Sequence, residues 1–203
     1  MAAPEMSAIT MPRAQALLDF WFGPPADPTR EERRDIWFRS TPDHDETLRG
    51  LFLADYERAA AGALAEWEEA PDSALALVLL LDQIPRNIFR GTPRAYATDA
   101  MARAVADRAI ERGFDMQVPP AWRLFFYMPL HHSENLADQQ RATALVASLP
   151  DRGDPERGEN RRYGLPYVDV IERFGRFPHR NAILGRQSTP EEIAFLARAE
   201  PEP

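Results

Sequence analysis

The chain has 203 residues and a formal net charge of −8. It contains no lysine, so all 24 of its cationic residues are arginines, and it contains no cysteine. The lack of lysine excludes a Schiff-base lysine, a pyridoxal-phosphate lysine and a P-loop lysine. The lack of cysteine excludes a thiol nucleophile, a disulfide, and thiolate-ligated zinc or iron–sulfur sites. A chain of this length typically forms one domain whose core needs no such crosslink to fold.

The acidic charge and the hydropathy pattern also bear on partners and location. A net charge of −8 argues against nonspecific nucleic-acid binding and against an anionic membrane surface, which both require a basic face. The longest apolar run, Ala74–Leu81, has 8 residues, whereas a membrane span needs about 20. We therefore expect a cytoplasmic protein without a nucleic-acid or membrane partner.

The first third of the chain has helical periodicity. One apolar face at i, i+3, i+4 and i+7 spacing comprises Ala14, Leu17, Leu18 and Trp21. This helix should end at Gly23. Thr29, with Glu32 three residues later, resembles a capping box and predicts a second helix to about Phe38. Thr41-Pro42 predicts the start of a third helix. Its expected buried face comprises Leu48, Leu51, Phe52, Tyr56 and Ala59.

A central core helix is predicted at about residues 73–84. Residues 74–81 are all apolar, and a helix that is apolar on every side is buried. A buried parallel strand is the alternative. A single β-branched residue, Val78, and helical patterns on both sides favour the helix. Pro85 should end or kink it.

Four further helices have recognisable starts. Thr98 is expected to cap a helix to Gly113, and Ser133 a helix over about 134–148. Pro119-Pro120 should begin a helix that carries an aromatic-rich segment. Thr189-Pro190, with Glu192 three residues after the threonine, predicts a last helix near 190–199. Between them, Tyr167, Val170, Ile171 and Phe174 again have i, i+3, i+4, i+7 spacing, and Gly175 should end that helix.

Strand signals are nearly absent, so we expect an all-α fold of antiparallel helical hairpins. It should form a single domain over 1–203, with a core at about 13–199 and a short flexible N-terminus. The polar stretch at about 150–160 is interpreted as a surface loop, because too little chain follows it to build a second core.

Three polar segments carry the candidate site residues, and the first follows the core helix. Asp82 comes after eight apolar residues, and a buried carboxylate needs a partner. Arg86 supplies one if the helix continues through Pro85. The structural interpretation is an ion pair that closes the helix, whereas the functional one places Arg86 and Asn87 in a cleft.

The second segment contains His132, Glu134 and Asp138. Glu134, Asp138 and Arg141 recur at helical spacing and should share one face. A histidine beside carboxylates can act as a general base. The alternative is a solvated helix face with Asp138 paired to Arg141. The spacing matches no known helical metal motif, so no metal is expected.

The third segment is rich in guanidinium groups. Its candidates are Arg176, His179, Arg180 and Asn181, preceded by Arg173. Planar guanidinium forks suit a carboxylate or a phosphate. The alternative is that these arginines pair with acids such as Glu172 or Asp169 across packed helices.

Three motifs identify a family resemblance: LLLDQIPRNIFRGTPRAYATD, FFYMPLHHSENLADQ and RFGRFPHRNAILGRQSTPEE. They resemble the family known as domain of unknown function 924, over about Ala14 to Leu196. The resemblance implies a tetratricopeptide-like, all-helical bundle and brings no activity, substrate or catalytic residue. His131 departs from the family pattern, in which an acidic or apolar residue is common, so His132 is the better candidate.

Three functions are compatible with these residues. In the first, the three segments converge on an Arg/His/Asn-lined cleft that binds an anionic small molecule or a peptide. In the second, the helices form a scaffold for a protein partner, a common use of such folds. In the third, His132 or His179 is the general base of a hydrolase, oriented by Glu134 or Asp138. No cofactor is expected, and the oligomeric state stays open.

Overall fold

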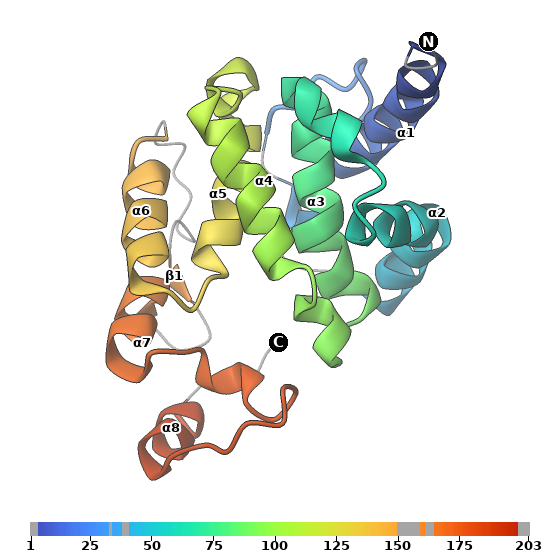
Figure 1. Cartoon of the computed structure of the whole chain (residues 1–203). Coiled ribbons are helices and arrows are strands. Elements are labelled where there is room, and N and C mark those ends of the chain that lie inside the picture. Colours follow the sequence, from blue (N-terminus) through green and yellow to red (C-terminus); the bar gives the residue numbers. More distant parts are fainter. Residues whose placement is uncertain (1–3, 33, 38–40, 150–158, 161–164, 199–203) are drawn as a thin grey trace. The chain divides into compact units, whose positions relative to one another are not determined.

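The computed structural model describes residues 4–32, 34–37, 41–149, 159–160 and 165–198 (Figure 1). Within these residues the protein is all-α, as the sequence predicts. The α-helices are α1 Pro4–Phe22, α2 Pro42–Ala60, α3 Pro71–Ile88, α4 Asp99–Glu111, α5 Pro120–His131, α6 Leu136–Ala147, α7 Tyr167–Phe174 and α8 Pro190–Leu196. Short 3-10 turns are η1 Asp35–Trp37, η2 Ala65–Glu69, η3 Pro93–Tyr96, η4 Asp115–Gln117 and η5 Pro178–Arg180. A two-residue antiparallel pair, β1 Glu159–Asn160 with β2 Leu165–Pro166, is too short to add a layer.

The chain forms two compact units. The first unit comprises Met1–Arg90 and Arg94–Pro129, and the second comprises Gly91–Pro93 and Leu130–Pro203. The expected single domain over 1–203 stays a prediction. α1 begins at Pro4, ahead of the expected start of the core near residue 13. The expected polar loop lies outside the described residues, except for 159–160.

Helix α3 is the centre of the first unit because it is apolar on every side. All residues from Ala74 to Leu81 are buried, and α3 contacts α1, α2, α4 and η2. The predicted core helix is therefore confirmed, and it continues past Pro85 to Ile88. Proline has no N–H to donate to the carbonyl four residues back, here that of Leu81. The Thr98 hydroxyl donates to this carbonyl at 2.6 Å, so a side chain from the start of α4 replaces the missing helical bond.

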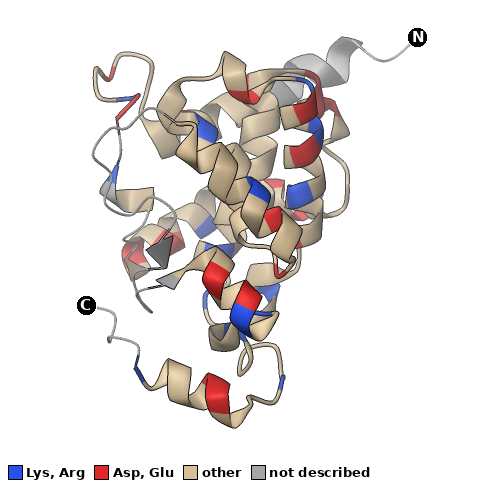
Figure 2. Cartoon of the chain, turned by 90° about the vertical axis from the view of Figure 1, so that its left-hand side faces the viewer, with Lys and Arg blue, Asp and Glu red and all other residues tan. Residues whose placement is uncertain are grey.

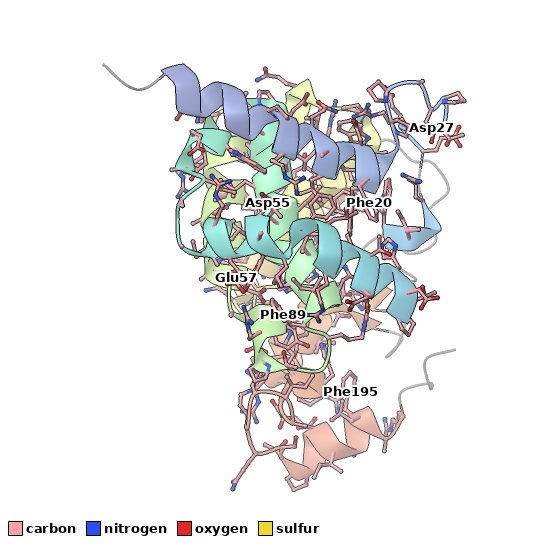
Figure 3. All side chains as sticks on the ribbon, turned by 90° about the vertical axis from the view of Figure 1, so that its right-hand side faces the viewer. Phe20, Asp27, Asp55, Glu57, Phe89 and Phe195 are labelled. Atoms are coloured by element: carbon pink, nitrogen blue, oxygen red, sulfur yellow. The ribbon has the colours of Figure 1, made fainter. Side chains whose placement is uncertain are left out.

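Two expectations in the N-terminal part are corrected. The second helix expected from Thr29 is absent from the described residues, which contain turns followed by η1. The backbone N–H and hydroxyl of Thr29 both donate to the Asp27 carboxylate, at 2.8 and 2.7 Å, so Thr29 closes an Asx turn. Leu51 is 47% exposed, and Asp55 is buried instead. Asp55 belongs to α2 and accepts from the Nε of Arg13 on α1 at 3.0 Å (Figure 3).

Side-chain caps mark the starts of α2, α6 and α8. Thr41 caps α2, and Thr189 with Glu192 forms a complete capping box on α8, as predicted. The predicted cap of α6 is wrong by two residues: Asn135 accepts from two backbone N–H groups of its first turn, whereas Ser133 donates to Asp138. Thr98 precedes α4 as expected, but its hydroxyl makes no cap bond, and it donates to the Leu81 carbonyl.

The second unit has a smaller apolar cluster. Its buried members are Val170, Ile171, Phe177 and Phe195. α6 packs on α7, and α8 contacts η5. Gly175 ends α7 with a φ of 65°, a left-handed conformation that glycine adopts without strain. This turn redirects the chain from α7 into η5, where the third candidate segment lies.

Charged residues of both signs are interspersed along the ribbon (Figure 2). Many form local pairs, such as Arg108 with Glu68 at 2.7 Å and Arg173 with Glu191 at 2.7 Å. Among the described residues, no helix combines the length and hydropathy that a membrane-spanning helix requires.

Candidate functional site

The candidate site residues divide between the two units. Asp82, Arg86 and Asn87 lie in the first unit; His132, Glu134, Asp138, Arg176, His179, Arg180 and Asn181 lie in the second. The structure therefore brings the second and third segments together within one unit. Convergence of all three segments on one cleft stays a prediction.

In the first unit, Arg86 connects two carboxylates at the end of α3. Its Nη1 and Nη2 donate to Asp99 at 2.8 and 2.9 Å, and Nη1 lies 3.3 Å from the fully buried Asp82. Burial alone would lower the pKa of Arg86, but the charges of Asp82 and Asp99 raise it above its ordinary value. The Asn87 amide donates to the Gln83 carbonyl at 3.0 Å. These contacts match the structural interpretation of an ion pair that closes the core helix.

In the second unit, Glu134 joins the second segment to the third. Arg186 donates to both of its carboxylate oxygens, at 2.6 and 2.9 Å, and the Phe177 N–H donates to it at 2.8 Å. Burial alone would raise the pKa of Glu134; the bonds from Arg186 and Phe177 outweigh burial and lower it. Glu134 precedes α6, so the expectation that it shares a helix face with Asp138 and Arg141 is wrong.

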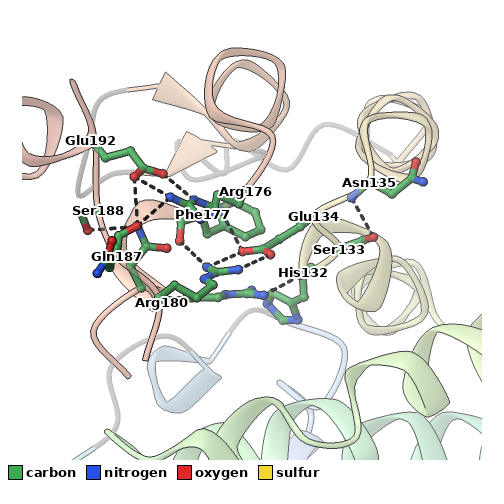
Figure 4. Close-up of polar contacts among 12 residues, drawn as sticks. His132, Ser133, Glu134, Asn135, Arg176, Phe177, Arg180, Gln187, Ser188 and Glu192 are labelled. Carbon is green, nitrogen blue, oxygen red and sulfur yellow. Dashed lines mark hydrogen bonds and ion pairs between the residues drawn. The ribbon is translucent and has the colours of Figure 1, made fainter. Parts of the chain in front are cut away.

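A second carboxylate, that of Glu192, accepts hydrogen bonds at the other end of the network of polar contacts that includes Glu134 (Figure 4). Arg176 donates to both of its oxygens, at 2.6 and 2.8 Å, and the Asn181 amide donates at 3.2 Å. The Thr189 N–H completes the set at 2.7 Å. The bonds from Arg176 are the largest cause of a pKa of about 2 for Glu192. Arg173 and Arg176 thus pair with Glu191 and Glu192 of α8. The pairing with acids is as the alternative predicts, but the partners differ from the expected examples, Asp169 and Glu172.

Arg180 lies beside His132 in the same network (Figure 4). Its Nη1 donates to the His132 carbonyl at 3.0 Å, and its guanidinium lies 4.5 Å from the centre of the Phe177 ring. Only 6% of Arg180 is exposed, whereas His132 and His179 are half-buried. The His179 ring lies 5.5 Å from that of Phe177. Asp138 accepts from the Ser133 hydroxyl at 2.6 Å.

His131 is buried, with 3% exposure, and its ring is tilted against Tyr167 at 5.7 Å. Burial is the largest cause that lowers its pKa, to about 4; the neighbouring His132 adds to the effect and Gln139 opposes it. The ring is therefore neutral at pH 7, and the choice of His132 as the better candidate stays a prediction.

Sequence reasoning missed two members of the network. Arg186 was not singled out, and Glu192 was recognised only as a capping residue. For Glu192, the capping box is the signal in the sequence, because it marks this carboxylate as fixed at the start of α8. The same carboxylate also accepts from Arg176. No local pattern marks Arg186, whose partner Glu134 lies 52 residues away in the chain.

This network, defined here as the Glu134–Glu192 network, holds three guanidinium groups, of Arg176, Arg180 and Arg186, around two carboxylates. Among the described residues, no group of three or more His, Asp or Glu is arranged to hold a metal ion. The donors present suit recognition of a carboxylate or phosphate.

Comparison with known proteins places the chain in a family. The profile of a bacterial protein of unknown function (DUF924) matches residues 17–200. The solved structure of ATU0120, a protein of unknown function from Agrobacterium tumefaciens, is 42% identical and superposes with a TM-score of 0.80. That match covers 92% of this chain and 98% of the other. Comparison with curated proteins finds no match. The chain therefore belongs to the DUF924 family of bacterial proteins, as its sequence motifs predict.

Proposed function

We propose that this protein is a binding module, and that the Glu134–Glu192 network binds the carboxylate of an anionic small molecule or peptide. The observation that carries the proposal is the gathering of three guanidinium groups, of Arg176, Arg180 and Arg186, in one partly buried cluster. Guanidinium forks concentrated in this way, in a chain of net charge −8, favour an anionic ligand over a neutral or cationic one.

The chemistry of the network supports a carboxylate as the group recognised. Arg186 and the Phe177 N–H already hold the Glu134 carboxylate, and Arg176 with the Thr189 N–H holds that of Glu192. Both sites combine a guanidinium fork with a backbone N–H, which is a strong geometry for a planar anion. A ligand carboxylate would be held by the same donor types, with Arg180, His132 and His179 beside them.

Two other functions have less support. The hydrolase hypothesis needs Glu134 or Asp138 to orient a histidine, but Glu134 is bonded to Arg186 and Asp138 to Ser133. The scaffold hypothesis requires a tetratricopeptide-like superhelix, and the packing of α2 on α3 and of α3 on α4 is compatible with one. A cytoplasmic location, and the lack of nucleic-acid and membrane partners, belong to the same proposal.

The test is isothermal titration calorimetry of the full chain with acetate, succinate, citrate, inorganic phosphate, and acetylated peptides with free or amidated C-termini. The key variant is Arg180→Ala. The matched control is Arg173→Ala, because Arg173 lies in the same unit but is exposed and pairs with Glu191 at the surface. Far-UV circular dichroism verifies folding of each variant. If Arg180→Ala unfolds, Arg180→Lys keeps the charge and removes the planar fork.

We expect at least one carboxylate ligand to bind the wild type and Arg173→Ala alike. Binding should be lost in folded Arg180→Ala. In Arg180→Lys the Kd should rise roughly tenfold, because lysine keeps the charge but lacks the planar fork; this change in Kd corresponds to about 1.4 kcal/mol. The proposal is wrong if no anion of the panel binds the wild type, or if the Arg180 variants bind as well as the control.

A further inference from the structure

The first unit contains an apolar pocket that the network in the second unit does not involve. Its volume is about 160 Å³. The buried side chains of Leu64, Leu77 and Leu81 line it. Small residues of α2, η2 and α4, and of the turn between α2 and η2, also line it: Ala59, Ala65, Ala104 and Gly62. A Cβ added to Gly62 would meet no atom within 4 Å, which agrees with open space beside it.

The charged residues that line the pocket neutralise each other. Arg108 donates through Nε and Nη2 to the two Glu68 oxygens, at 2.7 and 2.8 Å. The Arg112 Nη1 donates to the Glu68 carbonyl at 2.6 Å, which fixes the same segment. A charged ligand would have to displace this bidentate pair, whereas a neutral one leaves it intact. The lining therefore favours an uncharged, apolar ligand.

The pocket size limits the ligand to a single ring or a short hydrocarbon. Sites for drug-sized ligands and cofactors occupy about 300–1,000 Å³, which is well above the volume here. A closed, engineered apolar cavity of about 150 Å³ in another protein binds benzene; the pocket here has a similar volume and is open to solvent beside Gly62, Ala65 and Met101. We propose that this pocket binds a small neutral apolar molecule or group of about the size of one aromatic ring. This inference does not rest on the proposed carboxylate site.

Thermal unfolding of the full chain in benzene, and in benzoate as the charged analogue, tests the inference. The signal is tryptophan fluorescence, because all four tryptophans, Trp21, Trp37, Trp67 and Trp122, belong to the first unit. Ala104→Leu places an apolar side chain in the pocket. The control is Ala54→Leu, an exposed position on α2 that does not line the pocket. Ala65→Met, which fills the pocket from η2, replaces Ala104→Leu if that variant fails to fold.

At ten times its Kd, benzene should raise the Tm of the wild type and of Ala54→Leu by about 3–6 °C. The shift should vanish in Ala104→Leu or Ala65→Met, and benzoate should shift the wild type less than benzene does. The inference is overturned if benzene leaves the wild-type Tm unchanged, if it shifts the filled variants equally, or if benzoate has the larger effect.

Discussion

Replacing Arg86 by methionine is expected to destabilise the first unit by about 3–5 kcal/mol, which is typical of removing one partner of a buried ion pair. Methionine keeps much of the apolar stem and removes the charge and the hydrogen-bond donors. In the wild type, the guanidinium lies 2.8 Å from Asp99 and 3.3 Å from Asp82, whose side chain is fully buried. The variant leaves both carboxylates without this cation.

Urea unfolding followed by tryptophan fluorescence measures the loss, and its signal reports the first unit alone. The matched control is Arg90→Met. The Arg90 side chain is 60% exposed and pairs with Asp45 at 3.0 Å, and an exposed pair contributes about 0–1 kcal/mol. The two substitutions are chemically identical, so the difference between them isolates the effect of burial.

The deficit of Arg86→Met should also depend on pH. Burial without a cation favours the protonated form of a carboxyl, so the folded variant binds a proton more tightly than its unfolded chain does. The stability of the variant relative to the wild type should therefore recover as the pH falls from about 7 towards 5. Equal losses in Arg86→Met and Arg90→Met, or a deficit that grows in acid, would refute the reasoning.

Three further predictions address packing, protonation and capping. Leu79→Ala in the fully buried part of α3 should cost about 2–5 kcal/mol in urea unfolding, and Leu51→Ala, at a 47% exposed position, under about 1 kcal/mol. Similar losses would contradict the assigned burial. The pKa of His131 is about 4 against an ordinary 6.5, so protonation favours the unfolded chain. As the pH falls from 6.5 to about 4, the free energy of unfolding of the wild type should decrease by up to about 3 kcal/mol. His131→Phe should flatten that part of the stability profile measured by circular dichroism, and an unchanged slope would assign it to other groups. Thr189→Ala should cost about 0.5–2 kcal/mol and speed hydrogen exchange in α8, whereas Thr189→Ser should retain the cap.

The parts of the fold that depend on local sequence could be predicted, and those that depend on distant partners could not. The core helix follows from its own run of apolar residues, and the caps at Thr41 and Thr189 from the residues beside them. Thr98 looks like a local cap in sequence, but its hydroxyl bonds Leu81, 17 residues earlier. That bond follows from the proline inside α3, and a local pattern does not reveal which donor reaches the Leu81 carbonyl in place of the N–H that Pro85 lacks.

The candidate site shows the same division. The sequence identifies the arginine-rich segment and the segment around Glu134, because both are polar within apolar surroundings. It does not identify their connection through Arg186, since a pair separated by 52 residues has no periodicity. Spacing alone predicts that Glu134 belongs to a helix, whereas the side-chain cap of Asn135 places the helix start after it.

Three partly buried ion pairs of this protein, all formed by arginine, share one geometry. Arg86 with Asp99, Arg186 with Glu134 and Arg176 with Glu192 each bond both carboxylate oxygens. A lysine ammonium is a point charge on a flexible stem and does not reproduce this planar fork. Each fork fixes the orientation of the carboxylate plane and also balances its negative charge. The two forks of the second unit thereby hold the segments around Glu134 and Arg180 in one arrangement, and such preorganisation would lower the entropic cost of the proposed carboxylate binding.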